Sequence, residues 1–106
     1  SGLDNQKKLV KLFLGGNRIE AISGLDSLEG LVQLSLEDNE IRFIEGLDSL
    51  NSLKLLYLKR NEIRDIDNLD SLVKLGSLEL NGNPIDQQRN AAKIEKLKAC
   101  LTRFEM

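Results

Sequence analysis

The sequence predicts an α/β solenoid, in which short strands stack into one parallel sheet and a helix closes the C-terminal end. Three observations support this fold class. The sequence repeats with a period of 22 residues, since residues 31–52 and 53–74 are identical at 12 of their 22 positions. Leucines alternate with variable residues at one place in every repeat, as in a strand with one buried face. After Pro84 the repeat stops, and apolar residues recur at helical spacing.

The repeats are predicted to occupy residues 1–85. A partial repeat covers residues 1–8, and further repeats start at positions 9, 31, 53 and 75. The first four residues, S-G-L-D, match residues 23–26 one period later. We therefore expect the chain to begin partway through a repeat, either as part of a longer protein or with another element covering the first coil.

The repeat conserves a set of aliphatic residues and leaves other positions free. A fixed period in the twenties indicates a stacked solenoid, because one repeat cannot bury its leucines alone and neighbouring repeats bury them together. In the repeat that starts at position 31, the aliphatic columns are Leu31, Leu34, Leu36, Ile41, Ile44, Leu47 and Leu50.

An asparagine follows each predicted strand, at Asn17, Asn39, Asn61 and Asn83. Its amide both donates and accepts hydrogen bonds, so we expect it to satisfy backbone groups of the coils above and below. The L-D-S-L stretches on the opposite side of each coil are expected to form short turns or 3-10 segments.

The pattern L-x-x-L-x-L-x-x-N-x-I-x-x-I-x-x-L-x-x-L-x-x resembles the leucine-rich repeat family over about residues 9–104. The 22-residue length and the isoleucine pair resemble the subclass of the protein phosphatase 1 regulatory subunit, the spliceosomal A-prime protein, axonemal dynein light chain 1 and the internalins. This resemblance implies a right-handed, curved solenoid with a concave parallel sheet. It also implies a regulatory or scaffolding protein that binds its partners without catalysis.

Residues 86–106 are predicted to form a C-terminal cap helix followed by an edge segment. The helix is expected over residues 86–101, with Asp86 as its N-cap, and its role is to shield the open core of the last coil. Cys100 is expected to be a small buried or half-buried side chain. The closing L-T-R-F-E resembles the end of the cap found in intracellular leucine-rich repeat proteins. The apolar face of the helix is predicted to consist of Ala91, Ile94, Leu97 and Leu101.

Composition excludes several classes of function. Fifteen basic and seventeen acidic residues give a net charge of −2, which disfavours nucleic-acid binding driven by bulk charge. The chain has one cysteine, no histidine and no N-x-S/T sequon, which favours a cytoplasmic or other intracellular location. No phosphate-binding, dinucleotide-binding or metal-binding motif is present, so we expect no enzyme activity, no metal and no cofactor.

Candidate binding residues lie at the variable strand positions, which face away from the core. Phe13, Ser35 and Tyr57 share one column, and adjacent strands are about 4.8 Å apart. Phe13 and Tyr57 should therefore stand about 10 Å apart with the small Ser35 between them. We call these three residues and the adjacent Leu55 the aromatic notch. Aromatic anchors on a rigid surface are typical of interface hot spots, although isolated exposed apolar residues are also ordinary.

Charged residues flank the aromatic notch. Glu37 and Asp38 follow one strand, Lys59 and Arg60 follow the next, and Glu79 continues the column of the aromatic residues. We include all five in the predicted partner-binding surface. They can form cross-strand ion pairs, orient charges of a partner, or do both.

Three hypotheses for function follow. The first is a protein-interaction module whose sheet grips a helix or an extended segment of a partner protein. The second is a ribonucleoprotein component that contacts RNA through Tyr57, Lys59 and Arg60. The third is a bacterial surface adhesin of the internalin type, which the resemblance to an intracellular cap disfavours. Phe43, expected to be exposed or half packed, is a second, weaker contact candidate.

Overall fold

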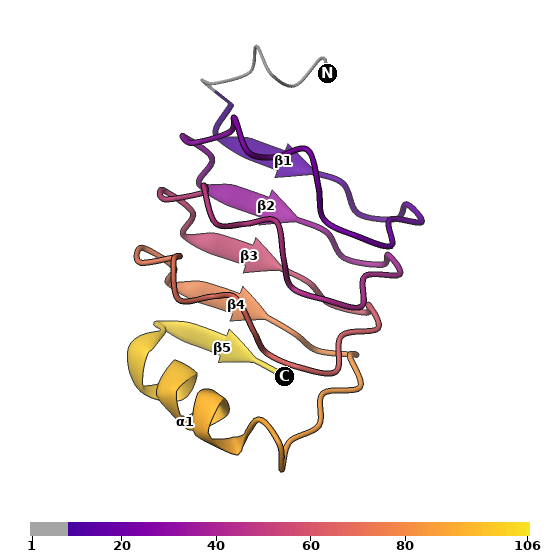
Figure 1. Cartoon of the computed structure of the whole chain (residues 1–106), viewed down its shortest axis with the longest axis vertical. Helices are drawn as coiled ribbons and strands as arrows, with labels where there is room; N and C mark the ends of the chain where they lie inside the picture. Colours follow the sequence, from indigo (N-terminus) through magenta and orange to yellow (C-terminus); the bar gives the residue numbers. More distant parts are fainter. Residues whose placement is uncertain (1–8) are drawn as a thin grey trace.

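The computed structural model describes residues 9–106, and its strands stack in chain order (Figure 1). The predicted partial repeat at residues 1–8 lies outside the described residues. All five strands pair in parallel in the order β1-β2-β3-β4-β5. The elements are β1 (Lys11–Phe13), β2 (Gln33–Ser35), β3 (Leu55–Tyr57), β4 (Ser77–Glu79), α1 (Ala91–Cys100) and β5 (Arg103–Glu105).

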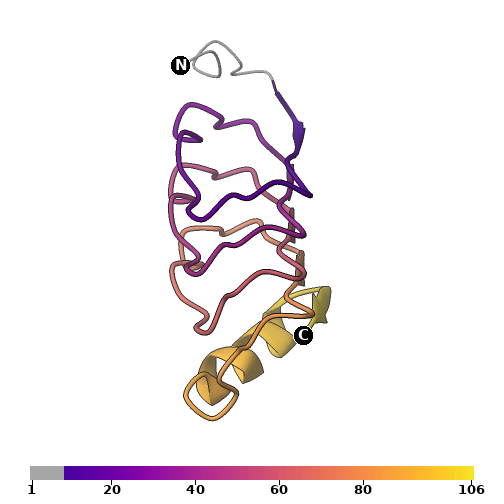
Figure 2. The same ribbon diagram turned by 90° about the vertical axis from the view of Figure 1, so that its right-hand side faces the viewer.

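The strands lie along one side of the stack, the connecting turns return along the other, and α1 crosses the C-terminal end (Figure 2). The return segments are tight turns: the N–H of Leu28 donates to the carbonyl of Leu25 at 3.0 Å, and the same bond recurs one and two repeats later. Of the two forms expected for the L-D-S-L stretches, the structure therefore shows short turns.

The core is the continuous column of aliphatic residues that the repeat predicts. Leu34 of β2 and Leu56 of β3 are completely buried, and the outward residues on either side of them alternate with this buried position. Leu12 and Leu14 are only partly buried, because among the described residues a coil packs on one side of them alone. Burying a leucine stabilises a protein by about 1.5–3 kcal/mol, so the middle coils hold the stack together most strongly.

The asparagines form a ladder beside the strands. Asn39 Nδ2 donates to the carbonyls of Leu36 and Glu37 in its own coil and of Leu14 in the preceding coil, at 2.9–3.1 Å. Its Oδ1 accepts the N–H of Ile19, also in the preceding coil. The side chain thus joins its own coil to the preceding coil, rather than the coils above and below as predicted from the sequence.

The cap helix begins later than the sequence predicts, at Ala91. Asp86 closes an earlier turn instead, since its carboxylate accepts the N–H of Arg89 at 3.0 Å. Asn90 separates this turn from the helix: its Oδ1 accepts the N–H of Ile66, and its Nδ2 donates to the carbonyl of Arg64. These bonds to the third coil hold Asn90 outside helical geometry, at φ −101° and ψ 13°.

The packed face of the cap is shifted from the predicted one. Ile94 is buried, and Leu97 and Leu101 pack against the core as expected. Ala91 is exposed, however, and the buried Asn90 takes its place in the stripe. Cys100 is exposed rather than buried, because at 100° per residue it lies on the flank of a helix that packs through Ile94.

Candidate functional site

The candidate site is the sheet face, which we define as the outward side chains of the five strands and of the turn residues that follow them. The register places Phe13 opposite Ser35, Ser35 opposite Tyr57, and Tyr57 opposite Glu79. The predicted column of candidate residues is therefore a row that runs across the sheet. The second row is Lys11, Gln33, Leu55, Ser77 and Arg103.

The aromatic notch has the geometry expected from the repeat. Phe13 is 63% exposed, and Tyr57 and Leu55 are half-buried. Ser35 is only 5% exposed although it alternates with the inward Leu34, so side chains of the flanking strands cover it. One strand separates Phe13 from Tyr57, which corresponds to a spacing of about 10 Å. Whether the notch binds a partner stays a prediction.

Asp38 and Arg60 form the cross-strand ion pair that the sequence predicts. Arg60 Nη2 donates to Asp38 Oδ2 at 2.9 Å, and Arg60 Nε pairs with Oδ1. The hydrogen bond from Arg60 holds the pKa of the Asp38 carboxyl below its ordinary value of 3.8. Both residues have positive φ angles, 59° and 56°, so the pair links two left-handed turns at the edge of the sheet face.

Lys59 forms ion pairs different from the predicted one. Its ammonium lies 3.3 Å from Glu79 and 3.7 Å from Glu105, whereas within residues 9–106 no ion pair joins it to Glu37. The physical reason is that two acids on its C-terminal side, Glu79 of β4 and Glu105 of β5, lie within reach of the ammonium. Lys59 therefore has acidic partners on its C-terminal side.

Sequence reasoning missed two residues of the sheet face, Arg103 and Glu105. They belong to β5, where they alternate with the inward Phe104 and pair with Ser77 and Glu79 of β4. The hydrogen bond from Arg103 lowers the pKa of the Glu105 carboxyl and raises the pKa of the guanidinium. The alternation R-F-E was the available signal, but it lies outside the 22-residue period.

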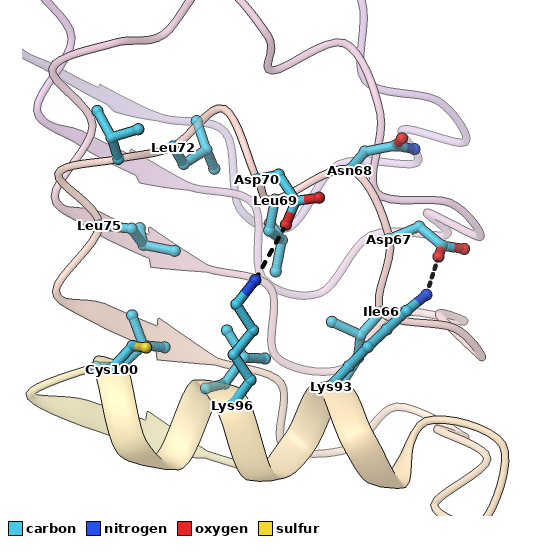
Figure 3. Close-up of a pocket in the computed structure, with 13 residues that line it drawn as sticks. Ile66, Asp67, Asn68, Leu69, Asp70, Leu72, Leu75, Lys93, Lys96 and Cys100 are labelled. Carbon is cyan, nitrogen blue, oxygen red and sulfur yellow. Dashed lines mark hydrogen bonds and ion pairs between the residues drawn. The ribbon is translucent and has the colours of Figure 1, made fainter.

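A groove of about 650 Å³ lies away from the sheet face, between α1 and the return segment of the third repeat (Figure 3). Leu69 and Leu75 line it and are partly buried, whereas Leu47 and Leu53, one repeat earlier, are completely buried under the next coil. Coils stack about 5 Å apart, whereas a helix with its side chains is about 10–12 Å across. The helix therefore leaves space that another coil would fill.

Ion pairs bridge this groove from the helix to the coil. Lys93 pairs with Asp67, and Lys96 Nζ lies 3.8 Å from Asp70 (Figure 3). Cys100 lines the groove from the C-terminal end of α1. The sequence analysis did not anticipate this groove, because the packing distance of a cap helix leaves no periodic signal.

Neither a metal-ion cluster nor a membrane-spanning helix occurs in residues 9–106. No group of three or more acidic, cysteine or histidine side chains there is placed to hold a metal ion. None of the helical segments in that range has the length and apolar character that a membrane span requires.

Comparison with known proteins identifies the fold. No protein-family model and no curated protein matches the chain. An internalin of Listeria monocytogenes, InlF, superposes with a TM-score of 0.79 and 33% sequence identity over 96% of this chain. A leucine-rich repeat protein of Leptospira interrogans superposes with a TM-score of 0.78 and 28% identity over 90% of this chain. The chain has the leucine-rich repeat fold.

A second internalin from the same Listeria strain agrees, with a TM-score of 0.78 and 30% identity over 95% of this chain. This chain spans 29%, 25% and 42% of the lengths of these three proteins, respectively. Each of those proteins thus contains much more than the region they share with this chain.

Proposed function

We propose that this leucine-rich repeat chain is a non-catalytic protein-interaction module that binds a segment of a partner protein on its sheet face, as part of a larger regulatory or scaffolding protein. The observation that carries the proposal is the aromatic notch. Phe13 presents an exposed ring at one end of the row that contains the half-buried Tyr57, and the half-buried Leu55 lies beside it in the second row. Aromatic residues of this kind supply most of the binding energy at protein interfaces.

The notch is suited to receive one apolar side chain. The strand positions of Phe13 and Tyr57 are about 10 Å apart, a span suited to an aliphatic group between the two side chains, and the covered Ser35 limits the depth of the space. Burial of such a side chain removes apolar surface of both partners from water, which favours association.

The scaffold beneath the notch is rigid. Leu34 and Leu56, which alternate with the outward residues, are completely buried, and the asparagine ladder fixes the turn after each strand. A preorganised surface loses less conformational entropy on binding, so a few anchors suffice for a specific interaction.

Two phenylalanines provide a matched test. Phe13 and Phe43 are 63% and 64% exposed, but only Phe13 belongs to the sheet face. Peptides are selected from a random display library on the intact chain, and their Kd is measured by fluorescence anisotropy. Phe13→Ala should weaken binding by about 2 kcal/mol or more, and so should Tyr57→Ala, whereas Phe43→Ala should leave it unchanged.

Melting curves check that each variant folds, as expected for the removal of an exposed ring. Equal losses for Phe13→Ala and Phe43→Ala would show that the peptides bind elsewhere. Failure of the library to yield any saturable binder would also count against an interaction module.

The two alternative functions gain no comparable support. Lys59 and Arg60, the cations expected to contact RNA, are ion-paired with Glu79 and Asp38, which reduces their attraction for phosphates. The adhesin hypothesis draws on the likeness to two internalins, but the Leptospira protein superposes with nearly the same TM-score, 0.78 against 0.79 and 0.78. We also propose an intracellular location, supported by the single cysteine and the missing sequons.

A further inference from the structure

The cap strand β5 continues the sheet face beyond the repeats. Arg103 pairs in register with Ser77, and Glu105 with Glu79. Both alternate with Phe104, which packs against the core, so both lie on the outward side with the candidate residues of the repeats. A partner that crosses the repeats therefore meets the cap as well.

The charges at this end of the sheet face are layered. Lys59 lies between Glu79 and Glu105, and Arg103 Nε donates to Glu105 Oε2 at 2.6 Å and lies 3.9 Å from Glu79. The Glu79 side chain is only 12% exposed, whereas that of Arg103 is 63% exposed. The acids thus lie beneath the guanidinium, and an approaching partner meets a cation first.

Arg103 also has hydrogen-bonding capacity to spare. A guanidinium carries five N–H donors, and Glu105 contacts it at Nε and Nη2. The remaining donors suit a second carboxylate. The row that contains Arg103 holds a second cation, Lys11, at its opposite end and no acid between them.

We propose that the partner segment presents a carboxylate to Arg103 while its apolar side chain occupies the aromatic notch; this proposal rests on the function proposed above. Three strand spacings separate Ser35 on β2 from β5, about 14 Å across the strands. Arg103 lies in the row of Leu55, two residues along the strand from the row of Ser35, so the two positions are about 16 Å apart. Side chains four apart in an extended peptide point to the same side and lie about 13 Å apart, and the long side chains of Arg103 and of the peptide's acid span the remaining distance.

A helix needs more ordered residues to reach both anchors. At 1.5 Å per residue it takes about 11 residues to cover about 16 Å, whereas an extended segment takes about five and loses less conformational entropy on binding. The geometry therefore selects an extended segment that crosses the strands, with an apolar residue and an Asp or Glu four positions apart.

A double-mutant cycle tests this proposal with synthetic fluorescent peptides taken from the library selection. The enriched peptides should carry an acidic residue four positions from an apolar one. Arg103→Gln should weaken their binding roughly tenfold. Replacing the peptide's Glu by Gln should weaken binding to the wild-type chain to the same extent and have little further effect on Arg103→Gln.

Arg89→Gln is the matched control, because Arg89 is also ion-paired and 58% exposed but lies on the cap away from the sheet face. It should leave peptide affinity unchanged. If Phe13→Ala weakens binding while Arg103→Gln does not, or if the cycle shows no coupling, the acidic contact is wrong and the interaction module stands. If neither Phe13→Ala nor Arg103→Gln has an effect, both proposals fail.

Discussion

At the scale of single residues, the asparagine after each strand joins neighbouring coils. Asn39 is buried and makes four hydrogen bonds to backbone groups, two of them in the preceding coil. Asn17 is exposed, and within residues 9–106 its side chain bonds to carbonyls of its own coil alone. An asparagine at the same place in the repeat therefore links neighbouring coils to a different extent in different coils.

Asn39→Ala should destabilise the chain by about 1–3 kcal/mol, because it leaves buried backbone groups without partners. Asn17→Ala, which removes the same amide at an exposed site, should cost much less. Urea unfolding followed by circular dichroism measures both free energies. Equal values for the two variants would contradict the role of the ladder.

Residue pairs on the sheet face were predictable only within the repeat. The period places Asp38 beside Arg60, and the structure contains that ion pair. Periodicity also placed Glu37 beside Lys59, but Lys59 pairs with Glu79 and Glu105. A repeat pattern specifies which columns lie side by side, whereas the choice among several acids depends on side-chain reach and on the non-repeating β5.

At the scale of elements, the cap combines a small apolar contact with several polar ones. Ile94 is its one buried aliphatic residue among those described in α1. Asn90 bonds to the third coil, and Arg89, Lys93 and Lys96 pair with Asp65, Asp67 and Asp70. Helical spacing predicted Ile94, Leu97 and Leu101 correctly, but the start of α1 depends on the tertiary bonds of Asn90, which no local pattern reveals.

The cap should therefore loosen at low pH before the repeats unfold. The hydrogen bond from Arg89, followed by that from Asn90, holds the pKa of Asp65 below its ordinary value of 3.8. A carboxyl with a lowered folded-state pKa stabilises the fold above the ordinary value, and this contribution disappears as the pH falls through the lowered one. Backbone chemical shifts measured between pH 6 and 2 should show α1 changing before β2 and β3.

Asp65→Asn provides the control for the acid transition. The amide cannot titrate, so the variant should have a weaker cap at neutral pH and a smaller loss on acidification. Simultaneous loss of α1 and the central strands in the unmodified chain would show that the cap is not a separate unit of stability.

At the scale of the whole molecule, burial is uneven along the stack. The same strand-end hydrogen bond recurs in successive coils, from the N–H of Leu14 to Ser35 O at 2.8 Å and from the N–H of Leu36 to Tyr57 O at 2.8 Å. Leu36 is almost fully buried, whereas Leu14 is partly buried. The two hydrogen bonds thus have the same length, but the one at Leu36 is better covered by apolar side chains than the one at Leu14.

Native-state amide exchange should report this difference. Exposed hydrogen bonds with little apolar cover open locally at low cost, so the amide of Leu14 should exchange at least about tenfold faster than that of Leu36. Hydrogen exchange followed by NMR at residue resolution measures both. Equal protection of the two amides would mean that the stack opens only as a whole.

The uniform register between β1, β2, β3 and β4 gives every joint in the repeat region the same backbone pairing. A duplicated copy of residues 31–52 would pack on the same aliphatic side chains and make the same asparagine hydrogen bonds as the original copy. The chain can thus lengthen by whole repeats. Each added repeat would place Phe13 one strand spacing farther from the cap, while the residues at both ends stayed unchanged. Evolution by duplication could in this way tune the span between two anchor points without redesigning either one.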